Sequence, residues 1–220
     1  MTTTEPRRLR ADAARNRQAL IDAAQRLFTV RGLSVTLDDI AAEAGVNVAT
    51  AYRNFANKHE LVQAFLQQIT DQAIRIAEEA AAVDDPWQGL TDFFAHTLRL
   101  MAENRGMHDI VSASYTADWM QHLEDRVNPA LKALLTRARK AGLIRPGLEP
   151  ADLGVILQML ATVTDIQTPD IAALVRRYLT LVFDGMRLAD NKLPGTAPSS
   201  SAVHAAAAQA DPGGRARGGG

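Results

Sequence analysis

Apolar residues recur every three or four positions along most of this chain, which is the spacing of one face of an α-helix. This spacing predicts amphipathic helices over residues 13–31, 61–82, 87–103 and 117–141, and a short apolar helical segment is predicted at 107–114. Two later segments, 150–164 and 170–188, are apolar almost all round, which predicts helices that are buried on more than one side. The sequence therefore predicts an all-α fold.

Two short helices joined by a tight turn are predicted between Thr36 and Lys58. Thr36 can cap the first of them, and Asp39 stands three residues on, where its carboxylate can complete a capping box. Gly45 can take the left-handed conformation that ends this helix, and Asn47 can cap the second helix. This arrangement is typical of a helix-turn-helix.

The second of these helices, which runs to about Phe55, has an outward face that suits DNA. Ala51, Phe55 and part of Tyr52 would face inward. The outward residues are short or hydrogen-bonding, apart from one arginine, and are Val48, Ala49, Thr50, Arg53 and Asn54. Such a surface can lie close to base edges in a major groove.

The residues from 14 to 62 resemble the DNA-binding half of the TetR family of transcriptional regulators. The resemblance rests on a helix that closes in Leu27, Phe28 and Gly32, and then on Thr36, Ile40, Ala41, Ala44, Gly45, Val46, Thr50, Tyr52, Arg53, Phe55 and Lys58. It implies a sequence-specific regulator, most simply a homodimeric repressor that leaves a near-palindromic operator when a small-molecule effector binds. Beyond residue 62 it implies only a helical layout.

Position assigns a role to each expected DNA contact. Thr50, Arg53, Asn54, Asn47 and Val48 would lie nearest the bases, with Ala49 beside them, and Thr36, Tyr52 and Lys58 would hold phosphates. Lys58 stands in the first turn of a helix, where the helix dipole disfavours a cation unless an anion binds there. The resemblance implies the same contact, and a solvated lysine is the alternative interpretation.

Charge is distributed unevenly although the formal net charge is only −1. The first 31 residues hold seven arginines against the three acids Glu5, Asp12 and Asp22. Residues 1–12 lack an apolar stripe, so we expect a flexible basic arm that reaches phosphates or, equally, a solvated tail.

Composition excludes several classes of function. The chain has no cysteine, which removes disulfides, thiolate zinc sites and cysteine nucleophiles. There is no apolar run of membrane-spanning length and no signal-peptide core, so we expect a cytoplasmic protein. No catalytic motif, cofactor motif or metal site is assigned. Asp118 and His122 stand one helical turn apart, and a surface hydrogen bond explains that spacing as well as a shared metal does.

The middle helices gather aromatic, methionine and histidine residues, among which the resemblance implies a small-molecule pocket. The candidates for its wall are Phe94, His96, His108, Trp119 and His122. Each aromatic residue can equally belong to the core.

Two subunits are expected to meet through the helices 150–164 and 170–188, as in the four-helix interface that the resemblance implies; a monomer core is the alternative. The expected domains are the basic arm at 1–12, the helix-turn-helix domain at 13–57, the ligand-binding and dimerisation domain at 58–190, and a disordered tail at 191–220, whose composition cannot bury enough apolar surface.

Two other functions remain open on the sequence alone. One is a helical ligand-binding or scaffold protein without DNA binding. The other is a small helical enzyme that uses Asp118 and His122 with a metal.

Overall fold

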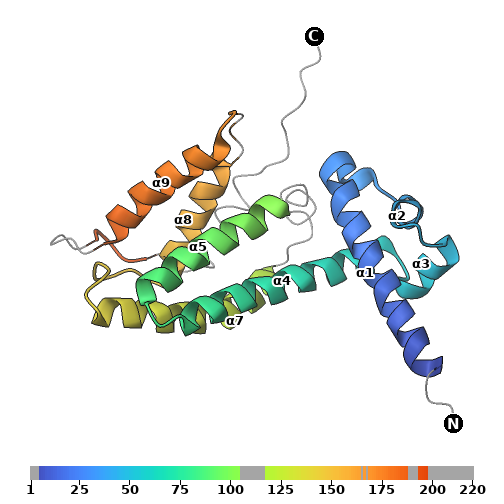
Figure 1. The fold of residues 1–220 in the computed structure, drawn as a ribbon, viewed down its shortest axis with the longest axis horizontal. Helices are drawn as coiled ribbons and strands as arrows, with labels where there is room; N and C mark the ends of the chain where they lie inside the picture. The colour runs from blue at the N-terminus through green and yellow to red at the C-terminus, as the bar shows by residue number, and fades with distance from the viewer. Residues whose placement is uncertain (1–4, 105–116, 165, 167, 188–192, 198–220) are drawn as a thin grey trace. The chain divides into compact units, whose positions relative to one another are not determined.

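The computed structural model describes residues 5–104, 117–164, 166, 168–187 and 193–197, and within these ranges all regular structure is helical (Figure 1). The elements are α1 (Glu5–Arg31), the 3-10 turn η1 (Gly32–Ser34), α2 (Leu37–Ala44), α3 (Val48–Asn54), α4 (Lys58–Ala82), α5 (Pro86–Glu103), α7 (Ala117–Lys140), α8 (Pro150–Val163) and α9 (Ile171–Met186). The predicted all-α fold is confirmed. The helix predicted at 107–114 and most of the tail expected at 191–220 lie outside the described residues.

Helix α1 begins at Glu5 rather than near Ala13. The flexible arm expected over residues 1–12 is therefore wrong from Glu5 onward, because that part of the chain is helical. Arginine, leucine and alanine are strong helix formers, and Pro6 is tolerated because it lies in the first turn, where its missing N–H has no partner to lose.

The chain divides into two compact units, and the division on α4 falls between Asp71 and Gln72. The expected domain boundary at residue 58 differs from it. The first half of α4 belongs to the first unit, where it contributes the buried residues Leu61, Val62, Phe65 and Leu66.

The core of the first unit is built where α1, α2 and α3 pack together. Its largest side chains with almost no exposed surface are Leu20, Phe28, Ile40, Phe55, Leu61 and Leu66. Removal of such side chains from water contributes about 1.5–3 kcal/mol each, so this small core holds the short helices α2 and α3 in place.

The core of the second unit is built from α5, α7 and α8 with the second half of α4 and one face of α9. Phe94 lies at its centre, and its ring centroid is 5.4 Å from that of Phe183 in an edge-to-face contact. The buried aliphatic residues around it include Leu90, Leu98, Leu131, Leu134, Leu135, Leu153, Leu157 and Leu160. Among the described helices, none is long and apolar enough to cross a membrane.

Candidate nucleic-acid interface

Helix α2 begins with the capping box that the sequence predicts. The Thr36 hydroxyl accepts a hydrogen bond from the Asp39 N–H at 3.1 Å, and the Thr36 N–H donates to the Asp39 carboxylate at 2.9 Å. The same hydroxyl donates to this carboxylate at 2.7 Å. These bonds satisfy amide groups that the helix leaves without partners, so they fix where α2 starts.

The capping box also stabilises the negative charge of Asp39. The hydrogen bonds from Thr36 lower the pKa of Asp39 below its ordinary value, the side-chain bond contributing most, and the nearby Arg31 guanidinium lowers it further. Arg31 Nη1 lies 3.3 Å from Asp39 Oδ1. The carboxylate is therefore ionised at neutral pH and keeps Arg31 beside the start of α2.

The turn between α2 and α3 has the expected geometry. Gly45 has a φ of +64°, a conformation that costs glycine little, and the Val46 N–H donates to the Ala41 carbonyl at 2.9 Å. The Asn47 side chain then accepts a hydrogen bond from the Ala49 N–H at 2.9 Å and caps α3. The predicted helix-turn-helix is thus confirmed residue by residue.

Helix α3 buries Ala51, and its outer face is open. Phe55, which follows the helix, is also fully buried, whereas Val48 is 43% and Tyr52 is 49% exposed. Tyr52 is therefore more exposed than the partly inward position expected for it. A hydrogen bond to the Asp38 carboxylate is the main reason why the pKa of Tyr52 is raised, and this bond directs the hydroxyl toward α2.

Two side chains of the outer face are tied to Thr50. Arg53 Nη2 donates to the Thr50 hydroxyl at 2.8 Å, and Asn54 Nδ2 donates to the Thr50 carbonyl at 2.8 Å. Asn54 is half-buried and turned toward its own helix, whereas Val48, Ala49 and Arg53 are exposed. Asn47 is exposed as well, so of the residues expected nearest the bases only Thr50 and Asn54 are half-buried.

Arg17 on α1 holds the end of α3, which the sequence did not reveal. Its Nη1 donates to the Asn54 carbonyl at 3.0 Å, and its guanidinium carbon lies 4.2 Å from the centroid of the Phe55 ring. A cation suits this position, because the carboxyl end of a helix carries partial negative charge. Arg17 and Asn54 are 37 positions apart, so no local pattern could have paired them.

Lys58 is the first residue of α4 and is half-exposed. The preceding Asn57 caps this helix, since its side chain accepts a hydrogen bond from the Glu60 N–H at 2.9 Å. The Glu60 carboxylate accepts from the Ala56 N–H at 2.7 Å. This local network fixes the turn that presents Lys58.

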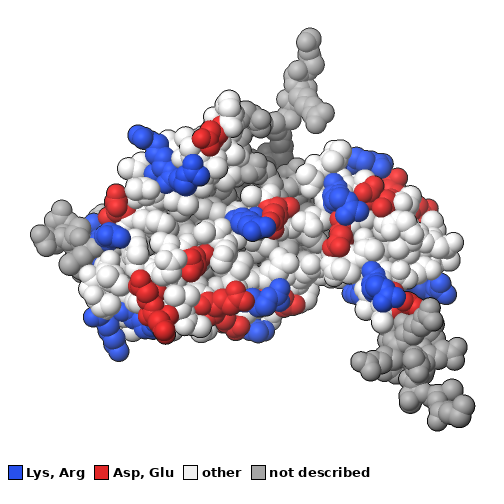
Figure 2. Space-filling view, in the orientation of Figure 1, with Lys and Arg blue, Asp and Glu red and all other residues white. Residues whose placement is uncertain are grey.

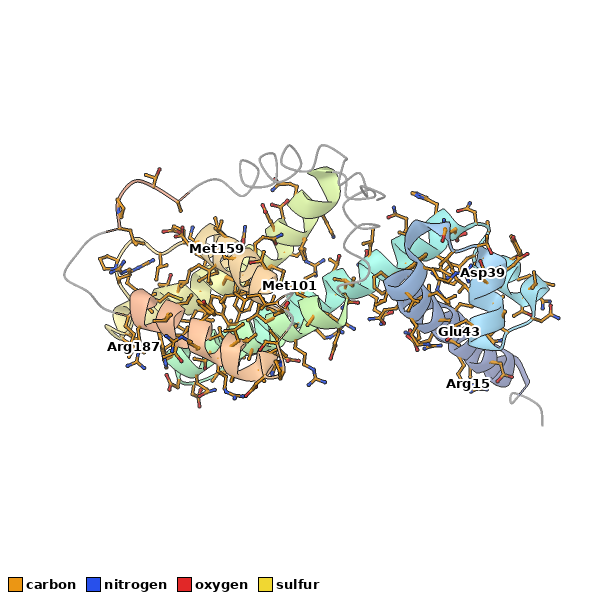
Figure 3. The ribbon with its side chains drawn as sticks, turned by 90° about the horizontal axis from the view of Figure 1, so that it is seen from above. Arg15, Asp39, Glu43, Met101, Met159 and Arg187 are labelled. Carbon is orange, nitrogen blue, oxygen red and sulfur yellow. The ribbon has the colours of Figure 1, made fainter. Side chains whose placement is uncertain are left out.

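Acidic and basic side chains alternate over the visible face of the first unit (Figure 2). Arg26 forms an ion pair with Glu43 of α2 at 3.0 Å, and Arg15 forms one with Asp12. Figure 3 labels Glu43 and Asp39 on the same helix. This face of the first unit is therefore not a broad basic surface.

Three of the candidates for a ligand pocket, Phe94, His96 and His122, have described side chains. Phe94 is buried in the core, whereas His96 and His122 are exposed. His108 and the side chains of Trp119 and Asp118 lie outside the described residues. A recess of about 410 Å³ in the second unit is lined by Asp85, Trp87, Gly142, Leu143 and Arg187, none of which the sequence pointed to.

Parts of both units match models of known protein families. Residues 20–65 match the family model of bacterial regulatory proteins of the tetR family, and residues 85–188 match that of the SbtR-like C-terminal domain of transcriptional regulators.

Individual relatives agree with these models. The HTH-type transcriptional regulator TtgR of Pseudomonas putida is 30% identical over 185 residues, which cover 80% of this chain and 85% of the relative. The HTH-type transcriptional repressor BepR of Brucella suis is 35% identical over 81 residues, or 36% of this chain and 39% of BepR. The crystal structure of a TetR transcriptional regulator from Streptomyces coelicolor is 28% identical and superposes with a TM-score of 0.61, covering 78% of this chain and 98% of that one. These relatives are transcriptional regulators, a class that is not enzymatic.

Proposed function

This chain belongs to the TetR family of DNA-binding transcriptional regulators, and from that premise we propose that it is a homodimeric repressor of a near-palindromic operator. The observation that carries this proposal is the capped helix-turn-helix, whose second helix presents an accessible outer face. Two such helices related by a twofold axis would enter successive major grooves about 34–36 Å apart, or a multiple of that distance.

Base contacts are assigned to the exposed end of α3. Arg53 is the side chain with the most donors, and its bond to Thr50 holds its guanidinium over the outer face, where it can donate to a guanine. Val48 and Ala49 can contact thymine methyl groups. The side-chain amides of Asn47 and Asn54 form hydrogen bonds with the backbone of α3. We therefore expect these two residues to contribute less to base recognition than Arg53.

Phosphate contacts are assigned to Thr36, Tyr52 and Lys58. Thr36 and Tyr52 are exposed, and Lys58 lies in the first turn of α4, where backbone N–H groups also favour an anion. The Tyr52 hydroxyl donates to Asp38 in the free protein, so it would have to exchange this bond for one to a phosphate.

The homodimer is proposed to form through α8 and α9, which lie side by side (Figure 1). These helices bury Leu153, Leu157 and Leu160 on one side, yet they leave large apolar side chains exposed on another. Met159 on α8 is 62% exposed (Figure 3), and Leu181 and Tyr178 on α9 are 57% and 40% exposed. Burial of such a surface against a symmetric copy removes it from water.

Relief of repression is proposed to pass through α4. This continuous helix begins at Lys58 and ends at Ala82 in the second unit, so an effector bound among the helices of that unit can tilt it. A coupling of about 1–3 kcal/mol would change operator affinity about 5- to 150-fold. A small apolar or amphipathic effector suits a helical, largely apolar body.

Selection of bound fragments from the source genome tests this function. We expect the purified chain to retain a small set of fragments that share a near-palindromic sequence. Retention of no fragment at low ionic strength would contradict the proposal, and retention of all fragments alike would contradict its sequence specificity.

A further inference from the structure

The recess of the second unit lies where three helix ends meet. Asp85 and Trp87 stand at the start of α5, Gly142 and Leu143 lie just after α7, and Arg187 follows the last residue of α9. Figure 3 labels Arg187 at the end of α9. All five residues belong to the second unit, so the recess is complete within that unit.

Backbone hydrogen bonds fix two sides of the recess. At the start of α5, the Asp85 carboxylate accepts a hydrogen bond from the Trp87 N–H at 2.9 Å. After α7, Gly142 has a φ of +68°, and the Leu143 N–H donates to the Ala138 carbonyl at 3.0 Å, a bond that closes many helix ends. These sides of the recess are therefore formed before any ligand binds, as in most small-molecule sites.

The end of α9 forms the third side and is held in the same way. Met186 is buried, and its carbonyl accepts a hydrogen bond from the Arg145 N–H at 3.0 Å. The Arg187 N–H donates to the Phe183 carbonyl at 3.1 Å. The backbone of Arg187 is thus fixed to the second unit, and its side chain extends from a defined position.

The guanidinium of Arg187 lies over the ring of Trp87. Its central carbon is 4.5 Å from the centroid of that ring, which is within the range of a cation–π interaction. Trp87 is itself held by an edge-to-face contact with Phe183, and the two ring centroids are 5.6 Å apart. The contact with Trp87 places the guanidinium beside the recess and uses none of its five N–H donors.

Within the described part of the chain, the donors of Arg187 have no acceptor. The exposed guanidinium forms no hydrogen bond or ion pair with a described residue, not even with Asp85, the acid that lines the same recess. A guanidinium that a ring holds in place and whose donors are free suits a carboxylate, which it can bind through two parallel hydrogen bonds.

The other side chains of the recess suit an apolar group. Trp87 and Leu143 are half-buried, so each presents part of an apolar side chain at the surface. The volume of about 410 Å³ is near the lower end of the range of about 300–1,000 Å³ for small-molecule sites. A matching ligand is therefore small, with an anionic end and an apolar end, and an aromatic ring suits the neighbouring Trp87 best.

We propose that this recess binds a small aromatic carboxylic acid, whose carboxylate pairs with Arg187 and whose ring packs against Trp87 and Leu143. The negative charge of Asp85 disfavours a second anionic group, so the ligand carries one carboxylate. The inference goes beyond the proposed function, because it concerns ligand binding by the second unit and requires no DNA.

The test uses naphthoate as the probe and naphthamide as its neutral counterpart, while octanoate supplies a carboxylate without a ring. The full chain is titrated with each compound by calorimetry in the absence of DNA. Because the chain has two tryptophans, incorporation of fluorotryptophan gives two fluorine NMR signals. Trp119→Phe removes one signal and thereby identifies the signal of Trp87, which reports binding in the recess.

Substitutions separate the parts of the site. Arg187→Gln removes the charge and the fork of donors, whereas Arg187→Lys keeps the charge alone. Asp85→Asn removes the opposing charge and keeps a side-chain oxygen that can cap α5. Arg176→Gln is the matched control, because Arg176 is an exposed arginine of α9 that does not line the recess. Thermal melting establishes that each variant is folded.

We expect naphthoate to bind the wild type and to shift the Trp87 signal, and both comparison compounds to bind more weakly. Arg187→Gln should weaken naphthoate binding about tenfold, the low end for loss of a hydrogen bond to a charged group, and Arg187→Lys should weaken it less. Asp85→Asn should strengthen binding, and Arg176→Gln should leave it unchanged.

Failure of naphthoate to bind the wild type, or a shift of the Trp119 signal alone, would overturn the proposal. Equal binding of naphthamide, or unchanged naphthoate binding in Arg187→Gln, would overturn it as well, because neither result needs the guanidinium. Weaker binding in Asp85→Asn would contradict an anionic ligand, and tighter binding of octanoate would contradict an aromatic one. If Arg187→Gln does not fold, Arg187→Lys decides by the same criterion.

Discussion

The two units of this molecule build their surfaces by opposite means. In the first unit, the short helices α2 and α3 are defined by side chains that bind backbone groups, as Thr36, Asn47 and Arg17 do. The outer face of α3 that they hold in place carries the exposed residues Val48, Ala49, Tyr52 and Arg53. In the second unit, helices are held by apolar packing, and α8 and α9 leave Met159 and Leu181 exposed.

On our proposal, the face of the first unit recognises DNA and the apolar face of the second unit binds a second copy of the chain. A face that must approach base edges needs small side chains at a fixed position, and caps supply that position without bulky residues. A face that must bind a second copy of the chain needs apolar area, because burial of that area drives association. Substitutions on α3 should therefore change DNA binding directly, whereas substitutions on α8 and α9 should act by dissociating the dimer.

The largest loss of operator affinity is expected from a substitution on the exposed apolar face of α9. Leu181→Arg places a charge where we propose a second subunit packs, so the dimer should dissociate and operator affinity should fall about 10²- to 10⁴-fold through loss of avidity. Analytical ultracentrifugation and operator titration measure both results. Thr180→Arg adds the same charge at the next, exposed position and should leave the dimer intact; a dimer that survives Leu181→Arg would rule out this interface.

The next largest loss of operator affinity is expected from a substitution on the outer face of α3. Arg53→Ala should cost about 1–3 kcal/mol of operator affinity and relax the preference at one base pair, since it removes donors to a base edge. Binding to a set of single-base operator variants measures this. Arg53→Lys serves as the control for charge, and a uniform loss on every variant sequence would mean that Arg53 contacts phosphate instead.

A smaller loss of DNA affinity is expected from a substitution at the start of α4. Lys58→Ala should weaken binding to all sequences alike, and the slope of log affinity against log salt should become shallower by about 0.9, the value for one phosphate. Lys58→Arg should restore the slope. If the alanine variant keeps the wild-type slope, Lys58 does not neutralise a phosphate.

The smallest effect concerns the capping box. The pKa of Asp39 is lowered in the folded state, so its contribution to stability is present above the ordinary value of 3.8 and is lost as the pH falls through the lowered value. Thr36→Ala should raise the pKa of Asp39 toward 3.8 and cost roughly 1 kcal/mol as a lost cap. A carboxyl-carbon NMR titration measures the shift, and Thr36→Ser should retain the low pKa.

Local features of the fold could be predicted from the sequence. Thr36 and Asp39, Gly45, and Asn47 all act on backbone groups within four positions of themselves. Their partners are fixed by chain connectivity, so residue type and spacing suffice to identify them. The helices α8 and α9 follow from apolar composition for a similar reason.

Features that depend on distant partners could not be predicted. Arg17 binds a carbonyl 37 positions away, and Arg137 binds carbonyls more than 50 positions away, so neither has a local signature. Phe94 and His96 were grouped by residue type, yet two positions on a helix differ by about 200°, which places one in the core and the other at the surface. The helical start at Glu5 was missed because a helix with no apolar stripe has no periodic signal.

Binding of the purified protein to its genomically selected palindrome over a series of salt concentrations tests the central claim most directly. We expect one dimer per fragment and a linear fall of log affinity with log salt, with a slope near −0.9 for each phosphate neutralised. A chain that stays monomeric and binds no fragment at low ionic strength would contradict the account.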